Sequence, residues 1–193
     1  MTTHLTDWAT LSWDMLIFSI PFVCAGTCNM IFTKSRILHK LRIPMDNGMV
    51  LNGKPLFGSN KTWKGFLGMI VFTVLWLVVC NTFLDLYFKT ENMWIFGAAL
   101  GLGYVLMELP NSLIKRQLNI DPGKTQSYGV GLLFQLIDQL DSVVGCVVVI
   151  ALFIDITWME VIAFLIVGTF VHLVVHWMLL LVKLKNYGAA TAQ

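Results

Sequence analysis

Two aspartates, Asp138 and Asp141, stand three residues apart inside a stretch that is otherwise largely apolar. At that spacing both carboxylates lie on one face of a helix. Burying two ionised carboxylates without a partner is very costly, so each needs a cation or a hydrogen-bond donor. Carboxylate oxygens suit Mg²⁺, which commonly binds one or two carboxylates together with substrate phosphates. The spacing alone leaves two interpretations equally open: a Mg²⁺ site, or either a structural ion pair with Lys115, Arg116 or Lys61 or solvation of the carboxylates at the membrane edge.

A second polar stretch follows the third apolar run of the chain. Its members recur at three-, four- and seven-residue spacings and form one stripe if the segment is helical: Glu108, Asn111, Ser112 and Lys115. Pro110 removes one backbone donor, so the helix either kinks there or begins anew. On a regular helix Arg116, which comes directly after the stripe, points elsewhere.

The third polar segment lies at 53–62 and almost satisfies a phosphate-loop pattern. Two residues separate Gly58 from Lys61 and no strand precedes them, so we reject a nucleotide-binding P-loop. A turn followed by Lys61, Thr62 and a helix start still aims backbone donors and an ammonium at one anion. The alternative is a polar turn in which Ser59 or Asn60 caps the next helix.

Histidines and cysteines give weaker signals. His172 and His176 stand four apart, which is compatible with metal binding on one helix face, but we favour a hydrogen-bonded interior role for them. The four cysteines show no C-x-x-C spacing, and we interpret them as apolar packing residues: Cys24, Cys28, Cys80 and Cys146.

The elements that must position these side chains are membrane helices. The 193 residues are 57% hydrophobic and 12% charged, with a mean hydropathy of +0.75, outside the usual balance of a soluble domain. A spanning helix needs roughly 20 predominantly apolar residues. Five stretches qualify: 11–32, 65–88, 93–109, 132–154 and 158–182. We therefore predict an all-α integral membrane protein with one transmembrane catalytic domain over 1–193.

Basic residues indicate the orientation of the spans. With five spans drawn, twelve of the thirteen Lys and Arg residues fall on one side, and Lys89 alone lies opposite. Because Lys and Arg accumulate in cytoplasmic loops, we predict an outside N-terminus, a cytoplasmic C-terminus and two polar cytoplasmic loops. The first span follows no basic region, so we expect it to be retained rather than cleaved as a signal peptide.

Two further patterns bear on packing. Between 34 and 43, Ile37, Leu38 and Leu41 share one helical face and the bases the other, which predicts a helix lying at the membrane interface. Three glycines in the third span allow close helix approach, and we interpret them as packing residues: Gly97, Gly101 and Gly103.

Taken together, these segments resemble the CDP-archaeol synthase family within the CTP-dependent phosphatidate cytidylyltransferases. The resemblance covers most of the chain. It is carried by the stretches PMDNG at 44–48, LFGSNKTWKG at 56–65, SLIKR at 112–116 and LIDQLD at 136–141. It implies a reaction that joins CTP to a lipid phosphate with Mg²⁺, giving a CDP-lipid and pyrophosphate for phospholipid biosynthesis.

The resemblance and the chemistry together give a candidate site. We expect the catalytic residues to be Asp138, Asp141, Lys115, Arg116 and Lys61. We expect substrate binding by Asp46, Gly58, Asn60, Lys61, Thr62, Lys64, Asn111, Ser112 and Gln139. Mg²⁺ would be held by Asp138 and Asp141, with Glu108 assisting. The roles of His172 and His176 are left open.

A different class of function also fits part of the pattern. A small ion or solute transporter can place carboxylates and histidines at membrane depth. A non-catalytic membrane scaffold is a further alternative, although it requires no such polar residues. Bases clustered beside the acids favour phosphate chemistry. We therefore expect an enzyme in the cell membrane, its site facing the cytoplasm, with CTP and an archaeol-type or phosphatidic acid phosphate as partners, no nucleic acid, and a homodimer as one possible assembly.

Overall fold

Five long helices make up nearly all of the structure. The computed structural model describes residues 7–121 and 130–181. The helices are α1 (Trp8–Lys34), α2 (Trp63–Phe83), α3 (Met93–Gln117), α4 (Val130–Phe153) and α5 (Trp158–Leu181). Each is long and apolar enough to cross a membrane, which confirms the predicted all-α membrane fold with five spans. Lys124, Lys183 and Lys185, used in the orientation argument, lie outside the described residues.

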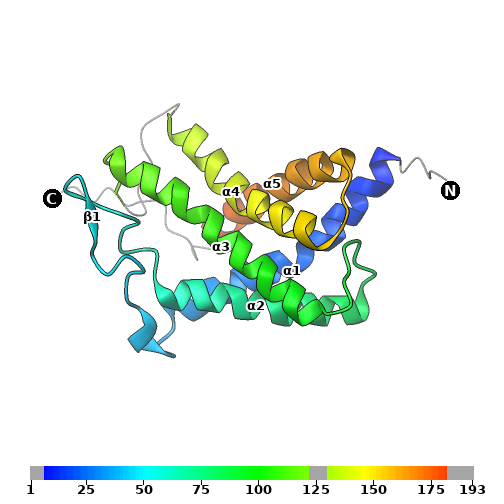
Figure 1. Ribbon diagram of the computed structural model, residues 1–193, viewed down its shortest axis with the longest axis horizontal. Helices are drawn as coiled ribbons and strands as arrows, with labels where there is room; N and C mark the ends of the chain where they lie inside the picture. Colours follow the sequence, from blue (N-terminus) through cyan, green and yellow to red (C-terminus); the bar gives the residue numbers. More distant parts are fainter. Residues whose placement is uncertain (1–6, 122–129, 182–193) are drawn as a thin grey trace.

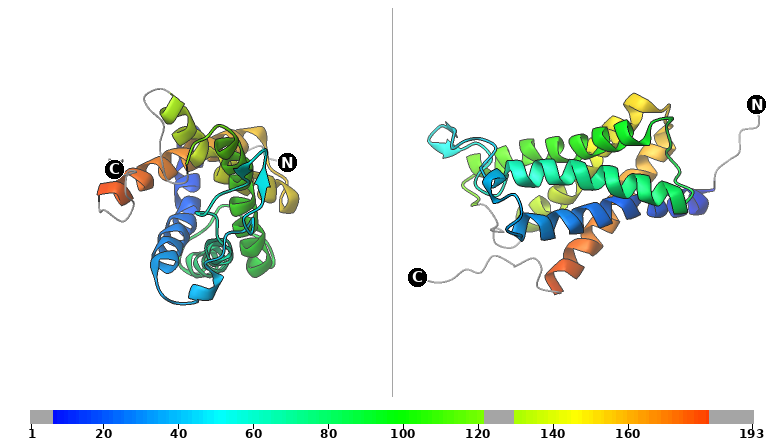
Figure 2. Two further views of the ribbon diagram at one scale, coloured as in Figure 1. Left: turned by 90° about the vertical axis from the view of Figure 1, so that its left-hand side faces the viewer. Right: turned by 90° about the horizontal axis from the view of Figure 1, so that it is seen from below.

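The helices form one bundle whose two ends differ (Figures 1 and 2). One end gathers the end of α1, the start of α2, the end of α3 and the start of α4, together with the loop 35–62. The other end carries the start of α1 and the links between α2 and α3 and between α4 and α5. In Figure 2, α5 leaves the bundle at an angle to the other helices.

Two of the predicted span boundaries are wrong. The second helix stops at Phe83 rather than Phe88, because the chain turns there and sends Leu86 and Phe88 back into the core, where each is buried. Phe88 packs edge-on against Phe18 with ring centroids 5.0 Å apart. The third helix does not end near Leu109 but continues through Pro110 to Gln117, since one missing backbone donor is tolerated in a packed membrane helix.

The predicted interfacial helix at 34–43 is also wrong. Helix α1 ends at Lys34, and only the short 3₁₀ turn η1 (His39–Leu41) follows. Ser35 explains the break, because its hydroxyl donates to Phe32 O at 2.7 Å and accepts from Ile37 N at 3.3 Å. Such local side-chain bonds compete with continued helix. Beyond it, Leu38 adopts a left-handed φ of 48°.

Small residues let α3 lie close to two neighbours at once. A β-carbon added at Gly101 would lie 2.7 Å from the Ile70 Cα of α2, and one at Gly145 of α4 would lie 2.2 Å from the Gly103 carbonyl oxygen. The packing interpretation of the glycines in α3 is therefore confirmed. The close crossing of α3 and α4 brings the polar stripe of α3 alongside the aspartates of α4.

The loop 35–62 covers the end of the bundle. It contains a small antiparallel hairpin of β1 (Val50–Leu51) and β2 (Lys54–Pro55). The Lys54 ammonium donates to the Gln117 carbonyl oxygen at 2.6 Å, so the hairpin caps the end of α3. Pro44 and Thr62 form an isolated antiparallel bridge that closes the base of the loop. These contacts fix Lys61 immediately before α2.

Candidate functional site

A polar cavity of about 350 Å³ lies between α3, α4 and the loop that precedes α2. It contains most of the charged residues predicted for the site. Its lining includes Lys61, Glu108, Asn111, Ser112, Lys115, Arg116, Asp138, Gln139 and Asp141. Residues from three separate stretches of sequence therefore meet in one place.

The two aspartates share a single amide donor. Asn111 Nδ2 donates to Asp138 Oδ1 at 2.5 Å and to Asp141 Oδ2 at 2.8 Å. Lys115 forms an ion pair with Asp138, and Asp141 Oδ1 also accepts from the Ser142 backbone N–H at 2.6 Å. Both interpretations that the spacing left open, an ion pair and a cation site, thus involve the same carboxylates.

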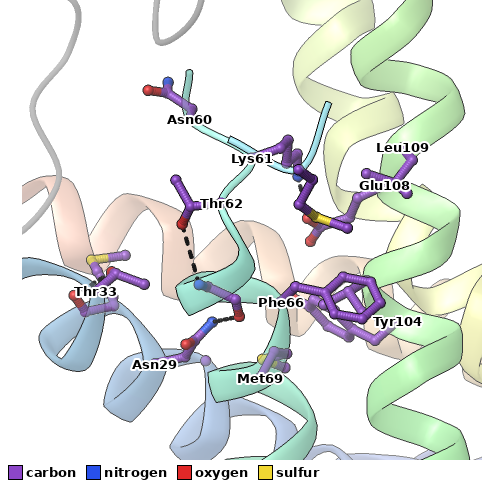
Figure 3. Close-up of a pocket in the computed structure, with 15 residues that line it drawn as sticks. Asn29, Thr33, Asn60, Lys61, Thr62, Phe66, Met69, Tyr104, Glu108 and Leu109 are labelled. Carbon is purple, nitrogen blue, oxygen red and sulfur yellow. Dashed lines mark hydrogen bonds and ion pairs between the residues drawn. The ribbon is translucent and has the colours of Figure 1, made fainter. Parts of the chain in front are cut away.

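Lys61 reaches from the loop to α3 and pairs with Glu108 (Figure 3). Burial disfavours the charged ammonium, but Glu108 and, farther off, Asp141 and Asp138 outweigh it and raise the pKa of Lys61 above its ordinary value. Lys61 therefore carries its positive charge throughout the physiological range. Its side chain keeps 28% of its surface exposed, which leaves the charge accessible from the cavity.

Glu108, which the sequence predicted to assist Asp138 and Asp141 in holding Mg²⁺, forms an ion pair with Lys61. Among residues 7–121 and 130–181, no three His, Cys, Asp or Glu side chains gather into a metal-binding group. Asp138 and Asp141 do converge, and beside them the Oδ1 atom of Asn111 is buried without a hydrogen-bond partner. The two carboxylates are oxygen ligands of the kind that Mg²⁺ prefers.

Arg116 lines the cavity and also holds the loop in place. Its Nε donates to the Phe57 carbonyl oxygen at 3.2 Å, and its Nη1 donates to the Ile120 carbonyl oxygen. The sequence pattern pointed Arg116 away from the polar stripe of α3. The loop folds over the end of the helix and so encloses Arg116 within the site.

Four of the predicted substrate-binding residues lie outside the lining of this cavity: Asp46, Gly58, Thr62 and Lys64. Asp46 is buried and accepts from the backbone N–H groups of Gly48, Phe57 and Gly58 at 2.9 to 3.1 Å. Burial opposes ionisation, but these donors lower the pKa of the Asp46 carboxyl below its usual value. Asp46 thus organises the turn that presents Lys61.

Lys64 and Thr62 secure the start of α2. The Lys64 ammonium is buried, donates to the Ser35 carbonyl oxygen at 2.8 Å and lies 4.6 Å from the Phe32 ring centroid. Thr62, rather than Ser59 or Asn60, is the N-cap, and its hydroxyl accepts from Gly65 N at 3.3 Å. Thr62 fits because it is the residue whose extended backbone immediately precedes the helix.

A second cavity, of about 240 Å³, lies on the other side of Lys61 (Figure 3). Asn60, Lys61, Tyr104 and Glu108 border both cavities. Asn29 of α1 lines its floor and donates from Nδ2 to the Gly65 carbonyl oxygen at 3.1 Å. The Lys61–Glu108 pair therefore borders both the polar cavity and this second, more apolar one.

Two residues of the cavity were missed or set aside at the level of sequence. Tyr104 lies one helical turn before Glu108, so extending the polar stripe backwards would have found it. Its hydroxyl lies 2.8 Å from His172 Nε2, and His172 Nδ1 lies 3.0 Å from Gln139 Oε1. His172 thus has the hydrogen-bonded interior position favoured from the sequence, and that position borders the site.

The chain is similar to known CDP-archaeol synthases. A family model described as CarS-like, CDP-archaeol synthase, matches residues 13–188. The chain is 30% identical over 177 residues to a CDP-archaeol synthase of Thermofilum pendens, covering 89% of this chain and 78% of that protein. It is 25% identical over 179 residues to a CDP-archaeol synthase of Saccharolobus islandicus, covering 92% and 98% respectively.

A solved structure shares the fold. It is an intramembrane enzyme for archaeal membrane lipids biosynthesis, and it matches with a TM-score of 0.53 and 24% identity over 80% of this chain and 92% of its own. At that identity the likeness establishes the fold. The family model covers most of the chain and confirms the resemblance found in the sequence. This multi-pass membrane protein therefore belongs to the CDP-archaeol synthase family of cytidylyltransferases.

Proposed function

We propose that the protein transfers the cytidylyl group of CTP to the phosphate of an archaeol-type lipid and releases pyrophosphate. The observation that carries this proposal is the convergence of two aspartates with Lys61, Lys115 and Arg116 in one cavity of a five-span helical bundle. Membership of the family supplies the reaction class. The arrangement has to serve a lipid headgroup and a soluble nucleotide together.

The transfer needs no nucleophile from the protein. An oxygen of the lipid phosphate attacks the α-phosphorus of CTP and forms a new P–O–P bond, while the bond from the α-phosphorus to its bridging oxygen breaks. Pyrophosphate leaves with that oxygen and its electron pair. Catalysis then consists of positioning the two phosphates in line and neutralising the charge that develops.

The three bases are placed for that neutralisation. Lys61 and Lys115 approach from the loop and from α3, and each is held by a carboxylate partner that a phosphate oxygen can displace. Arg116 is tied to two carbonyl oxygens and shapes the wall of the cavity. Ser112 and Asn60 line the same space and can add polar contacts to the substrates.

Mg²⁺ completes the proposed site. The cavity lining holds three bases and three acids, so its formal charges cancel before any substrate binds: Lys61, Lys115 and Arg116 against Glu108, Asp138 and Asp141. A nucleoside triphosphate adds several negative charges that this balance cannot absorb. Asp138 and Asp141 would hold the cation, beside the Asn111 amide. It would neutralise phosphate oxygens and polarise the α-phosphorus.

The orientation in the membrane is part of the proposal. Nine of the twelve bases assigned to the cytoplasmic side lie between 34 and 116, in loop 35–62 or at the helix ends that adjoin it. Lys89 lies at the opposite end of the bundle. The positive-inside tendency therefore supports a site on the cytoplasmic face of the cell membrane, with the N-terminus outside.

We also propose that 1–193 act as one catalytic domain.

A lipid panel tests the proposal. Purified protein would be incubated with Mg²⁺, CTP labelled at the α-phosphate, and either an unsaturated diether glycerol phosphate or phosphatidic acid. We expect a labelled CDP-lipid with the diether, and its rate relative to phosphatidic acid measures chain specificity. The transporter alternative gains no support from the relatives found. Solute flux through reconstituted vesicles, with no labelled lipid from any phosphate, would restore that alternative.

A further inference from the structure

We infer that the hydrogen-bonded chain Tyr104–His172–Gln139 is the lipid-phosphate side of the site, with Gln139 binding the lipid phosphate and His172 and Tyr104 acting as positioning residues. This inference rests on the proposed function and deepens it. It assigns one wall of the shared cavity to one of the two substrates.

The first observation is a narrow apolar groove that adjoins the polar cavity. It has a volume of about 120 Å³ and runs between α1 and α5. Phe22, Val23 and Met30 of α1 face Val175 and Leu179 of α5 across it. Thr27 and His176 also border this groove, but most of its surface is apolar, which suits hydrocarbon chains better than a triphosphate.

The second observation is that the groove and the polar cavity share three lining residues. These are Tyr104, Gln139 and His172, and they are the same three residues that hydrogen-bond in a row. A lipid phosphate needs an apolar space for its chains joined directly to a charged space for its headgroup. The three shared residues mark that junction.

The hydrogen bonds of the chain fix the direction of the Gln139 amide. The Gln139 Oε1 atom can only accept, so His172 Nδ1 carries the hydrogen of that 3.0 Å bond. His172 Nε2 lies 2.8 Å from the Tyr104 hydroxyl, within hydrogen-bond distance, so the tyrosine fixes the other side of the ring. With Oε1 occupied by histidine, the Nε2 hydrogens of Gln139 are directed away from His172.

That direction has a chemical consequence. Gln139 stands between Asp138 and Asp141 in α4 and lines the polar cavity. An amide donor held next to the proposed Mg²⁺ ligands can bind an oxygen of an incoming phosphate. The reversed amide would present an oxygen, which repels phosphate. The Nδ1–H···Oε1 bond thus holds the amide in the orientation that is useful for binding.

The experiment compares variants in two measurements: the KM values for lipid phosphate and for CTP, and the Kd for the diether glycerol phosphate alone in detergent. His172→Leu removes the donor to Gln139, so we expect the KM and Kd for the lipid phosphate to rise roughly tenfold. The KM for CTP should stay within about twofold. His172→Asn keeps an N–H near the Nδ1 position and should recover most of the loss.

Two further variants keep the test decisive. Tyr104→Phe deletes one hydroxyl, is expected to fold, and should raise the lipid KM roughly threefold through looser positioning of the histidine. Thr169→Val is the matched control on α5, one turn before His172. Its hydroxyl is buried without a partner in the described residues, so its removal should change neither KM.

The outcomes separate the inference from the proposed function. If His172→Leu and Tyr104→Phe raise the KM for CTP instead, or leave lipid binding unchanged, the inference is wrong although wild-type transfer continues. An Asn variant as impaired as the Leu variant would also overturn it. If wild type binds the lipid phosphate and transfers nothing, the proposed function fails, and the Kd values still decide the role of His172.

Discussion

The two ends of the bundle use polar residues for different purposes. At the end opposite the cavity, the Tyr87 hydroxyl donates to Glu160 Oε1 at 2.6 Å, and Glu160 Oε2 accepts from both the backbone and the hydroxyl of Thr157. These groups cap α5 and satisfy one another. At the cavity end, the ion pairs Lys61–Glu108 and Lys115–Asp138 face a polar cavity.

This difference separates stability from activity along the bundle axis. Polar groups that complete each other's hydrogen bonds stabilise the fold and have no capacity left for a ligand. Charged groups that pair across a cavity can exchange a partner for a ligand, so they keep binding capacity at some cost to stability. Variants at the two ends should therefore differ in kind, with catalytic losses at the cavity end and losses of stability at the other.

The largest expected effect is at the aspartates. Asp138→Asn or Asp141→Asn keeps the shape of the side chain and removes a negative charge from the proposed Mg²⁺ site. We expect the rate of CDP-lipid formation to fall roughly 1,000-fold, while the Tm in detergent changes little. Rates at several Mg²⁺ concentrations and thermal melts measure the two effects. Wild-type turnover by Asp138→Asn at ordinary Mg²⁺ would contradict the metal role.

Next comes a comparison of two lysines three residues apart. Lys61→Met removes a charge that faces the cavity and should lower the rate roughly 100-fold. Lys64→Met removes a buried ammonium that holds Ser35, so it should lower the Tm and leave the KM for CTP unchanged in the protein that folds. Steady-state kinetics with thermal melts distinguish the two. Equal kinetic losses would show that Lys64 also meets substrate.

Asp46 should give a pH-dependent effect on stability. Its pKa is lowered in the folded state, so its stabilisation is fully present above the ordinary carboxyl pKa of about 4 and is lost as pH falls through the lower folded value. Asp46→Ala strands buried donors and should cost about 2 kcal/mol near neutral pH. Melts between pH 3 and 7 should show the difference shrinking towards acid. A constant difference would contradict this account.

The smallest expected effect is at the opposite end. Burial and the bond to Glu160 raise the pKa of Tyr87 to about 12, so the phenol stays neutral at physiological pH. Tyr87→Phe removes one hydrogen bond and should lower stability by about 1 kcal/mol with no change in either KM. Denaturation and kinetics on the same preparation check this. A large loss of activity would break the distinction between the ends.

Much of this arrangement could be predicted from the sequence, for physical reasons. Apolar length and flanking charge define spans, so all five were predicted, and α1, α4 and α5 agree with the structure to within a few residues. The end of α2 was wrong because Leu86 and Phe88 look like continued membrane helix yet turn back into the core. Hydrophobicity alone does not separate lipid-facing residues from core residues.

The charged residues that line the cavity could be predicted from the sequence. The residues that hold the surrounding backbone in place could not be told apart from them. The predicted charges do meet in the cavity, because ionisable side chains in a membrane protein face its interior and pair with one another. They are Asp138, Asp141, Lys61 and Lys115. Asp46 and Lys64 share a motif with Lys61 but lie behind the cavity lining. A single sequence does not reveal whether a polar residue in a motif faces the substrate or the backbone that holds the loop.

The most direct test of cytidylyl transfer is to compare the fates of the α- and γ-phosphates of CTP in parallel reactions. One preparation of CTP would carry ³²P at the α-phosphate and another at the γ-phosphate, each mixed with protein, Mg²⁺ and the diether glycerol phosphate. We predict that the α label enters the lipid phase while the γ label stays in water as pyrophosphate in equal amount, and that chelation of Mg²⁺ or Asp141→Asn abolishes both products. Appearance of the γ label in the lipid, or consumption of CTP without any labelled lipid, would contradict the account.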